Sequence, residues 1–328
     1  MSWRMVVWLS DNAKSNNNIN STDEINKDLI IQCDNLVKIY KTIDSEVIAL
    51  QGLDLNVAPG ELMAIVGRSG SGKSTLLNML GGLDTPTAGR LFVDGKDLFK
   101  MNRKSLIEYK RSTVGFIWQN NARNLFPYLN SLQNVQVPMM FASEKEKKEK
   151  AERLLELVGM SHKSKNRLSE MSGGEQQRIA IAISLANDPK ILLADEPTGS
   201  VDKATAGHIM DVFRELNSKL NTTIVIVTHD MDLAKEVNRV VSIQDGKISS
   251  EMHAKLDYRE RMKNITLYSD IHDEYSILDR AGRIQLPQNM LEEMGVKDNR
   301  VKIEYVDDSI VIKAAQEKEE EKAKDINS

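Results

Sequence analysis

The chain has 328 residues, of which 41% are hydrophobic and 28% are charged, and this length is enough for about two domains. Its 44 basic and 48 acidic residues give a formal charge of −4, which excludes the strongly basic balance of a dedicated nucleic-acid binder. Because Cys33 is the only cysteine, an intramolecular disulfide is excluded and a reducing compartment is favoured.

The N-terminal region is mainly polar. Its apolar run, Met5-Val6-Val7-Trp8-Leu9, is shorter than the roughly 7–15 residues of a signal-peptide core. Residues 10–28 are rich in Asn and Ser and bury too little to order themselves, so we predict a flexible leader over residues 1–28. Nowhere does an apolar run approach the roughly 18 residues of a membrane span, so a membrane function would need another chain to supply the membrane part.

Strand-like composition begins near Leu29. The turn signal Asp94-Gly95 closes this part of the chain. Because the segments are rich in β-branched and aliphatic residues and separated by turn residues, they predict a β-rich subdomain joined to a larger core. The strand-like segments are Ile30–Val37, Val47–Val57, Glu61–Val66 and Leu91–Val93.

A phosphate-binding loop follows the third of these strands. Residues 67–74 fit the pattern Gly-x-x-x-x-Gly-Lys-Ser/Thr, between the apolar Leu62–Val66 and a helical segment, Ser74–Leu80. A chance Gly/Ser-rich turn is the alternative, but the partner motifs described below are also present. We expect Lys73 to reach the β- and γ-phosphates of ATP and Ser74 to ligate Mg²⁺. The predicted phosphate-binding residues are Gly67, Arg68, Ser69, Gly70, Ser71, Gly72, Lys73, Ser74 and Thr75.

The glycines explain how such a loop binds an anion. At positions 67, 70 and 72 they let backbone N–H groups turn inward around phosphate oxygens. The N-terminus of the following helix adds unpaired donors and the positive end of its dipole.

A helix is predicted from a capping box further along the chain. Ser143 and Glu146 have the Ser-x-x-Glu spacing, apolar residues within 154–158 share one face, and Gly159 ends the segment. The apolar segments Ile191–Ala194 and Thr223–Val227 then lie on either side of a helical stretch near residues 204–220, which indicates a parallel α/β sheet. Residues 240–248 close this core.

Two adjacent carboxylates end one of these strands. Asp195 would emerge at the carboxyl edge of the sheet beside the phosphate loop and hold Mg²⁺ directly or through water. Glu196 follows it and would face an attacking water. An isolated pair of this kind could merely cap a strand, but the loop at 67–74 favours the catalytic interpretation.

The order of these motifs resembles that of ATP-binding cassette (ABC) ATPases. The resemblance implies an α/β fold: a P-loop NTPase core with an antiparallel β-subdomain and a helical signature subdomain. It also implies that ATP closes a head-to-tail dimer, here a homodimer, which hydrolysis reopens. The segments that carry it are Gly67–Ser74, Gln119, Ser172–Gln176, Ile191–Glu196, Ser200–Asp202 and His229.

The family signature corresponds to Ser172, Gly173 and Gly174, which by resemblance bind the γ-phosphate held by the opposite subunit. The physics is consistent, because small residues opening a helix over 175–186 present free N–H donors to an anion. Glu175 is included in the predicted nucleotide-binding set.

Three further residues take their roles from the resemblance. Gln119 corresponds to the residue that links Mg²⁺ and water to the membrane partner, and His229 to the residue that contacts the γ-phosphate. Tyr40 corresponds to the aromatic residue that stacks on adenine, a task that suits tyrosine because stacking tolerates any base. Alone, Gln119 and His229 would be ordinary polar residues, and Tyr40 a plain strand aromatic.

Within the family, residues 76–84 and 192–199 resemble the branch of lipoprotein-releasing, macrolide-exporting and division-associated ATPases. These work with an FtsX/MacB-like membrane permease on a separate chain, which implies a cytoplasmic location at the inner face of the membrane. Two departures are notable: Met171 replaces a leucine, a swap that conserves volume, and the segment Asn120–Leu129 is long. Apolar residues of this segment would form a groove for a permease helix or, alternatively, pack on themselves.

The C-terminal region alternates between strand-like segments and one short helix over 275–313, and residues 278–296 resemble the AbrB-like swapped-hairpin domain. Many members of that family bind DNA. Over residues 270–314, however, six basic residues face ten acidic ones, so we expect dimerisation and no nucleic-acid partner. The predicted organisation is a leader 1–28, an ABC ATP-binding domain 29–249, a linker 250–270, a swapped-hairpin domain 271–315 and a disordered tail 316–328.

The leading interpretation is the ATP-hydrolysing subunit of an ABC transporter or mechanotransmission complex. One alternative is a soluble ABC ATPase of DNA repair or translation, although the span between Lys73 and Ser172 lacks the heptad run of a coiled-coil insertion. The other is a DNA-binding regulator that responds to ATP through its C-terminal domain.

Overall fold

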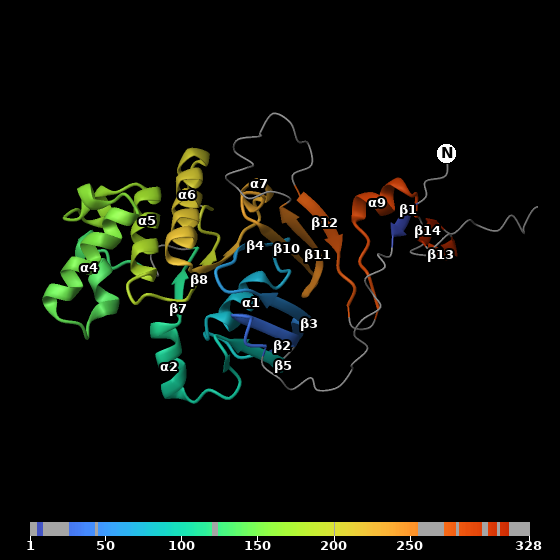
Figure 1. Ribbon diagram of the computed structural model, residues 1–328, viewed down its shortest axis with the longest axis horizontal. Coiled ribbons are helices and arrows are strands. Elements are labelled where there is room, and N and C mark those ends of the chain that lie inside the picture. The colour runs from blue at the N-terminus through green and yellow to red at the C-terminus, as the bar shows by residue number, and fades with distance from the viewer. Residues whose placement is uncertain are drawn as a thin grey trace, which may run out of the picture. The chain divides into compact units, whose positions relative to one another are not determined.

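The chain divides into two compact units. One comprises Ile25–Ile277, and the other combines Met1–Glu24 with Leu278–Ser328. All predicted site motifs belong to the first unit, most of whose elements are labelled in Figure 1. The computed structural model describes residues 5–8, 26–42, 45–119, 124–199, 201–254, 272–279, 282–296, 301–306 and 309–314.

The larger unit is built around a seven-stranded sheet with the order β12-β11-β10-β4-β9-β8-β7. Its five strands from β10 to β7 run parallel to one another. Strand β11 is antiparallel to its neighbour β10, and β12 is antiparallel to β11. Every residue of β4 and β9 is buried, which explains why both appear in the sequence as continuous apolar runs. The bounds are β4 Leu62–Val66, β7 Val114–Ile117, β8 Ile191–Asp195, β9 Thr223–Val227, β10 Arg239–Gln244, β11 Lys247–Ala254 and β12 His272–Ser276.

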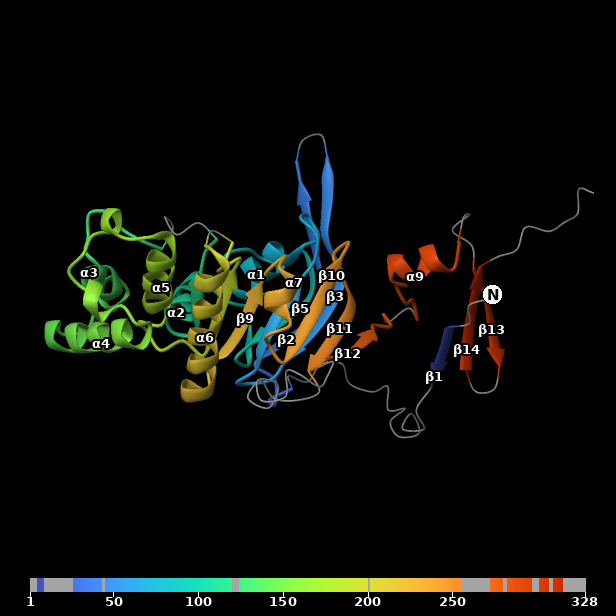
Figure 2. The ribbon, with the colours of Figure 1, turned by 90° about the horizontal axis from the view of Figure 1, so that it is seen from above.

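A four-stranded antiparallel sheet, β3-β2-β5-β6, forms the predicted β-subdomain. Its β2–β3 hairpin projects from the unit in Figure 2. Residues of this sheet share one hydrophobic core with helix α1 and with one face of β4, so the phosphate loop between β4 and α1 lies where the two sheets meet. The bounds are β2 Ile31–Lys41, β3 Glu46–Val57, β5 Ala88–Val93, β6 Lys96–Asp97 and α1 Lys73–Leu80.

Helices complete the unit, and α3, α4 and α5 pack together as the predicted helical subdomain (Figure 2). The capping box at the start of α4 is confirmed, because Ser143 Oγ accepts the Glu146 N–H and the Glu146 carboxylate accepts the Ser143 N–H. Met171 is buried, and its sulfur accepts a hydrogen bond from Ser131 Oγ. The bounds are α2 Arg103–Ser112, α3 Ser131–Gln136, α4 Glu144–Leu157, α5 Gly173–Ser184, α6 Lys203–Leu220 and α7 Met231–Ala234.

The α/β fold expected from the sequence, with an antiparallel β-subdomain and a helical subdomain, is therefore confirmed. Among the helices of the described residues, none combines the length and apolar character that crossing a bilayer requires.

The smaller unit contains a three-stranded sheet with the order β1-β14-β13 and a short helix, α9. Strand β13, Val301–Val306, forms a hairpin with β14, Ser309–Ala314. The third strand, β1, is Met5–Trp8 from the predicted leader. An edge strand presents unpaired N–H and C=O groups, and a short apolar segment can satisfy them, which is why this part of the leader is ordered. Helix α9 spans Gln288–Glu293.

The boundary between the units also differs from the predicted one. Residues 250–254, assigned to the linker, continue β11, and His272–Ser276, assigned to the swapped-hairpin domain, pair with β11 as β12. The physical reason is again an open sheet edge, here that of β11. Most of the predicted leader, residues 255–271 and the predicted tail lie outside the described residues.

Candidate active site

The phosphate loop joins β4 to α1 and depends on glycine at two close backbone approaches. Gly72 precedes α1 with φ 105°, and a Cβ there would lie 2.5 Å from the carbonyl oxygen of Ala49. A Cβ at Gly67 would lie 2.3 Å from the carbonyl oxygen of Ile243. Larger residues would displace the loop from β3 and β10, so the glycines are needed for packing as well as for backbone freedom.

Lys73 and Ser71 line this loop from within. The Lys73 ammonium donates to the carbonyl oxygens of Gly67, at 2.8 Å, and Arg68, at 2.9 Å. Among the described residues, the buried Ser71 Oγ has no hydrogen-bond partner. A buried cation and an unpaired hydroxyl beside a helix N-terminus suit a bound anion, because each donor would be satisfied by a phosphate oxygen.

The carboxyl edge of the sheet brings the first predicted metal ligands together. Asp195 is the last residue of β8, and Ser74 Oγ donates to its Oδ1 across 3.3 Å. A hydroxyl and a carboxylate oxygen are the hard ligands that Mg²⁺ prefers, usually completed by waters and substrate phosphates. The donor set therefore fits a magnesium ion.

Glu196 and His229 meet at the same edge. His229 Nδ1 lies 2.9 Å from Glu196 Oε1, and the Glu196 N–H donates to the carbonyl oxygen of Val227. Glu196 has φ 48°, a left-handed conformation that is uncommon for a non-glycine residue. Its Oε2 is buried and unpartnered within the described part of the chain. The Glu196 carboxylate is thus held by one oxygen, and the other accepts no hydrogen bond from the described residues.

The signature residues open helix α5. Ser172 Oγ accepts the Glu175 N–H, and the Glu175 carboxylate accepts the Ser172 N–H at 2.8 Å. That backbone hydrogen bond, together with the nearby Lys163 ammonium, outweighs burial and lowers the pKa of Glu175. A Cβ at Gly174 would lie 2.2 Å from Thr205 Cγ2 at the start of α6. The signature turn is therefore fixed by a capping box and by close packing.

The capping role of Glu175 was absent from the sequence interpretation, although Ser172 and Glu175 show the same Ser-x-x-Glu spacing that identified α4. Helix α5 lies apart from α1 in both ribbon views (Figures 1 and 2). Within one chain, the signature and the phosphate loop consequently occupy separate elements.

Gln119 follows β7 and is exposed. The preceding residue is fixed by Asn124, whose Oδ1 accepts the Trp118 N–H at 3.1 Å and whose amide donates to the carbonyl oxygen of Phe116. Residues 120–123, the start of the long segment predicted to form a groove, are outside the described residues, as is Ser200.

The remainder of that segment is organised by a buried amide. Asn134 donates to the carbonyl oxygens of Phe126, Leu129 and Asn130 and accepts the Phe126 N–H at 2.7 Å. Tyr128, within this segment, is 68% exposed. Exposed apolar side chains of the same region are Phe126, Tyr128, Met140 and Phe141.

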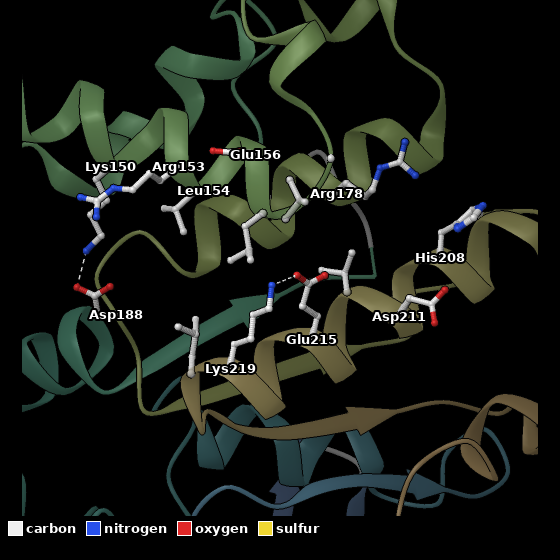
Figure 3. Close-up of a pocket in the computed structure, with 15 residues that line it drawn as sticks. Lys150, Arg153, Leu154, Glu156, Arg178, Asp188, His208, Asp211, Glu215 and Lys219 are labelled. Atoms are coloured by element: carbon white, nitrogen blue, oxygen red, sulfur yellow. Dashed lines mark hydrogen bonds and ion pairs between the residues drawn. The ribbon is translucent and has the colours of Figure 1, made fainter. Parts of the chain in front are cut away.

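A cleft of about 1150 Å³ lies between α4, α5 and α6 (Figure 3). Leucine and valine side chains form part of its wall, and two of its cations are paired, Lys150 with Asp188 and Lys219 with Glu215. None of its lining residues is a predicted site residue. The cleft is therefore separate from the phosphate loop and the carboxylates.

Comparisons with known proteins agree with this geometry. The family model described as ABC transporter matches residues 50–199. The dimeric post-hydrolysis state of the ATP-binding cassette MJ0796, bound to ADP and Pi, is 36% identical, with a TM-score of 0.63, and the match covers 67% of this chain and 97% of that one.

Two further structures are similar over comparable lengths. The dimeric MJ0796, described as a bacterial ABC transporter cassette, is 37% identical over 67% of this chain and 97% of that one, with a TM-score of 0.63. The cbiO1 protein from Clostridium perfringens, part of the ABC transporter complex cbiONQ, is 29% identical over 73% of this chain and 92% of that one, with a TM-score of 0.63.

Proposed function

Because the chain belongs to the ATP-binding cassettes of the ABC transporter family and is an ATPase, we propose that it energises a separate membrane permease through ATP-driven head-to-tail dimerisation. The observation that carries this proposal is the convergence of the phosphate loop, the Ser74–Asp195 contact and the Glu196–His229 pair at one sheet edge. These residues belong to different segments of the chain. Hydrolysis needs phosphate binding, metal binding and a proton acceptor in one place.

The phosphate loop would bind the nucleotide. The backbone N–H groups of residues 67–75 and the Lys73 ammonium would take the phosphate oxygens, and Ser71 Oγ would donate to one of them. Ser74 and Asp195 would hold Mg²⁺, with Gln119 reaching it from the end of β7. The metal ion would neutralise charge on the phosphates.

Hydrolysis would depend on Glu196. Its buried Oε2 would accept a proton from the attacking water, while His229 holds the other carboxylate oxygen at 2.9 Å. His229 is 72% exposed at its side chain, so it can also turn toward a γ-phosphate.

The signature would complete the site of a second subunit. The first-turn N–H groups of Gly173 and Gly174 have no intrahelical acceptors, and the cap formed by Ser172 and Glu175 keeps that turn in place. Two separate elements of one chain can serve two nucleotides only if two chains meet head to tail. Two of the similar structures, both of MJ0796, are dimeric.

The permease would bind at the exposed apolar side chains Phe126, Tyr128, Met140 and Phe141. Phe141 is 80% exposed and Met140 66% exposed, the rings of Phe126 and Tyr128 lie 5.9 Å apart, and a permease helix would cover these apolar side chains. We infer a permease with a large extracytoplasmic domain, which would bring the ATPase to the inner face of the membrane.

Co-purification tests the permease partnership. We expect the tagged chain, co-expressed with such a permease, to be recovered with it from detergent-solubilised membranes, and Phe141→Asp with Tyr128→Asp to reduce that recovery at least about tenfold, because charges oppose burial. Leu220→Asp, which changes a 54% exposed leucine on α6, serves as the control. Retention on DNA at physiological salt, with no membrane recovery, would favour the regulator instead.

The smaller unit would be an AbrB-like dimerisation domain. On one face of β13, Ile303 is 65% exposed and Tyr305 66% exposed, beside the partly exposed Val301. A strand with an uncovered apolar face needs a partner surface. Such a dimer would raise the effective concentration of the two ATPase subunits.

We therefore predict that the full chain without nucleotide is a dimer in light scattering, and that Ile303→Glu with Tyr305→Glu is a monomer. Lys302→Glu, on the opposite face of β13, is the control and should remain dimeric. If the wild-type chain is a monomer at tens of micromolar, this role of the smaller unit is wrong.

A further inference from the structure

Tyr40 is attached to a partly buried ion pair, in which the side chain of Lys38 is 11% exposed and that of Asp84 26% exposed. Its phenol donates to Asp84 Oδ2 at 2.7 Å, and the Lys38 ammonium donates to Asp84 Oδ1 at 2.6 Å and to the carbonyl oxygen of Thr85 at 2.8 Å. The same ammonium lies 4.7 Å from the centre of the Tyr40 ring. Lys38 and Asp84 thus contact both the hydroxyl and the face of this tyrosine.

The ion pair connects two parts of the nucleotide site. Lys38 and Tyr40 are two residues apart on β2, and their side chains meet at Asp84. Asp84 follows α1, and its N–H donates to the carbonyl oxygen of Asn78 within that helix. The ring of Tyr40 is consequently fixed to the helix that begins with the phosphate loop.

The protonation states of Asp84 and Tyr40 determine which group donates the hydrogen bond and which accepts it. Burial acts to raise the pKa of Asp84, but hydrogen bonds from Lys38, Tyr40 and the Thr85 N–H outweigh it, and the pKa is lowered. Burial, followed by the bond to Asp84, raises the pKa of Tyr40. At neutral pH the phenol is therefore a donor and the carboxylate an acceptor. Lys38 is only 8% exposed, so loss of Asp84 would leave a buried cation without its counter-ion.

We propose that Lys38 and Asp84 are positioning residues that hold the Tyr40 ring in the orientation that stacks on the nucleobase. This inference rests on the stacking role that the sequence resemblance predicts for Tyr40. An aromatic ring that is already fixed loses little conformational freedom when a base packs on it. Lys38 and Asp84 should therefore contribute to the affinity for the base and make no contribution to the affinity for the phosphates.

The test compares ADP with inorganic pyrophosphate, which has no base and is not hydrolysed by the ATPase. Dissociation constants of the full chain are measured by calorimetry with Mg²⁺ for Tyr40→Ala, Tyr40→Phe, Asp84→Ala and Lys38→Met. We expect Tyr40→Ala to weaken ADP binding by roughly fivefold to a hundredfold. Each of the other three variants should weaken ADP binding by roughly three- to tenfold. Pyrophosphate binding should change less than about twofold in all four.

Controls separate positioning from folding. Lys41→Met removes the exposed Lys41–Glu46 pair of the same hairpin, whose side chains are 67% and 60% exposed, and should leave both affinities unchanged. Melting without nucleotide reports any loss of stability. If Asp84→Ala fails to fold, Lys38→Met and Tyr40→Phe still give the comparison. The Tyr40→Phe and Asp84→Ala losses should be less than additive in the double variant, because they break one hydrogen bond.

The dissociation constants of the variants distinguish three cases. Equal losses for ADP and pyrophosphate would show a merely structural role and overturn the inference. If Tyr40→Ala weakens ADP binding but Asp84→Ala and Lys38→Met do not, the inference fails and the stacking role stands. If Tyr40→Ala leaves ADP binding unchanged, both are wrong.

Discussion

Glu196→Gln is expected to lower steady-state ATP hydrolysis roughly 10²- to 10⁴-fold while ATP binding is retained. The amide keeps the size of the side chain and an oxygen within reach of His229 Nδ1, which lies 2.9 Å from the carboxylate. It cannot accept a proton from water. Since the phosphate loop is untouched, ATP-bound chains should accumulate as the closed dimer.

The measurement pairs phosphate release with light scattering in the presence of ATP. Glu108→Gln, which changes a carboxylate on α2 that pairs with Arg111 at the surface, is the control and should be fully active. Near-normal turnover of the Glu196 variant would exclude this residue as the base.

Ser172→Arg is expected to abolish hydrolysis when both subunits carry it, with nucleotide binding by each phosphate loop preserved. The arginine would cover the first-turn N–H groups of α5 that we assign to the opposite γ-phosphate. It also removes the cap in which Ser172 Oγ accepts the Glu175 N–H, a change that costs about 0.5–2 kcal/mol of stability. The two effects must be separated.

The chain offers a matched control. Ser143 forms the same kind of capping box with Glu146 at the start of α4. Ser143→Arg therefore removes an equivalent cap from a helix to which we assign no role in phosphate binding. We expect that variant to melt at a lower temperature yet hydrolyse ATP. Equal loss of activity in the two variants would attribute the Ser172 effect to instability.

Mixed dimers sharpen the test. When Ser172→Arg chains are mixed with Lys73→Ala chains, one composite site carries both lesions and the other carries neither. Partial activity should return if the sites work separately. If mixed dimers form without any activity, either the composite site is wrong or both sites must be intact.

The parts of the fold that the sequence predicts are those with local signals. The phosphate loop lies between an apolar run and a helix, and the cap at Ser143 depends on residues three positions apart. Asp195 could be placed beside Ser74 because parallel strands end at a common edge. These inferences need only short-range patterns and one topological rule.

Contacts between distant segments leave no such pattern. The bond from Tyr40 to Asp84 joins residues 44 positions apart, and neither residue is unusual in its own segment. Strand β12 pairs with β11 because that edge is open, a property of the assembled sheet that composition over 271–277 does not reveal. Glu175 is different, since its spacing from Ser172 was a readable capping signal.

The pairing of β1 with β14 has a consequence for the order of events during synthesis. The smaller unit draws strands from both ends of the chain, Met5–Trp8 and Ser309–Ala314, so the ATPase cassette is in effect an insertion within it. Translation proceeds from the N-terminus, and domains fold as units while it does so. The cassette can therefore fold on the ribosome before β14 has been synthesised, and β1 can pair with β14 only after that.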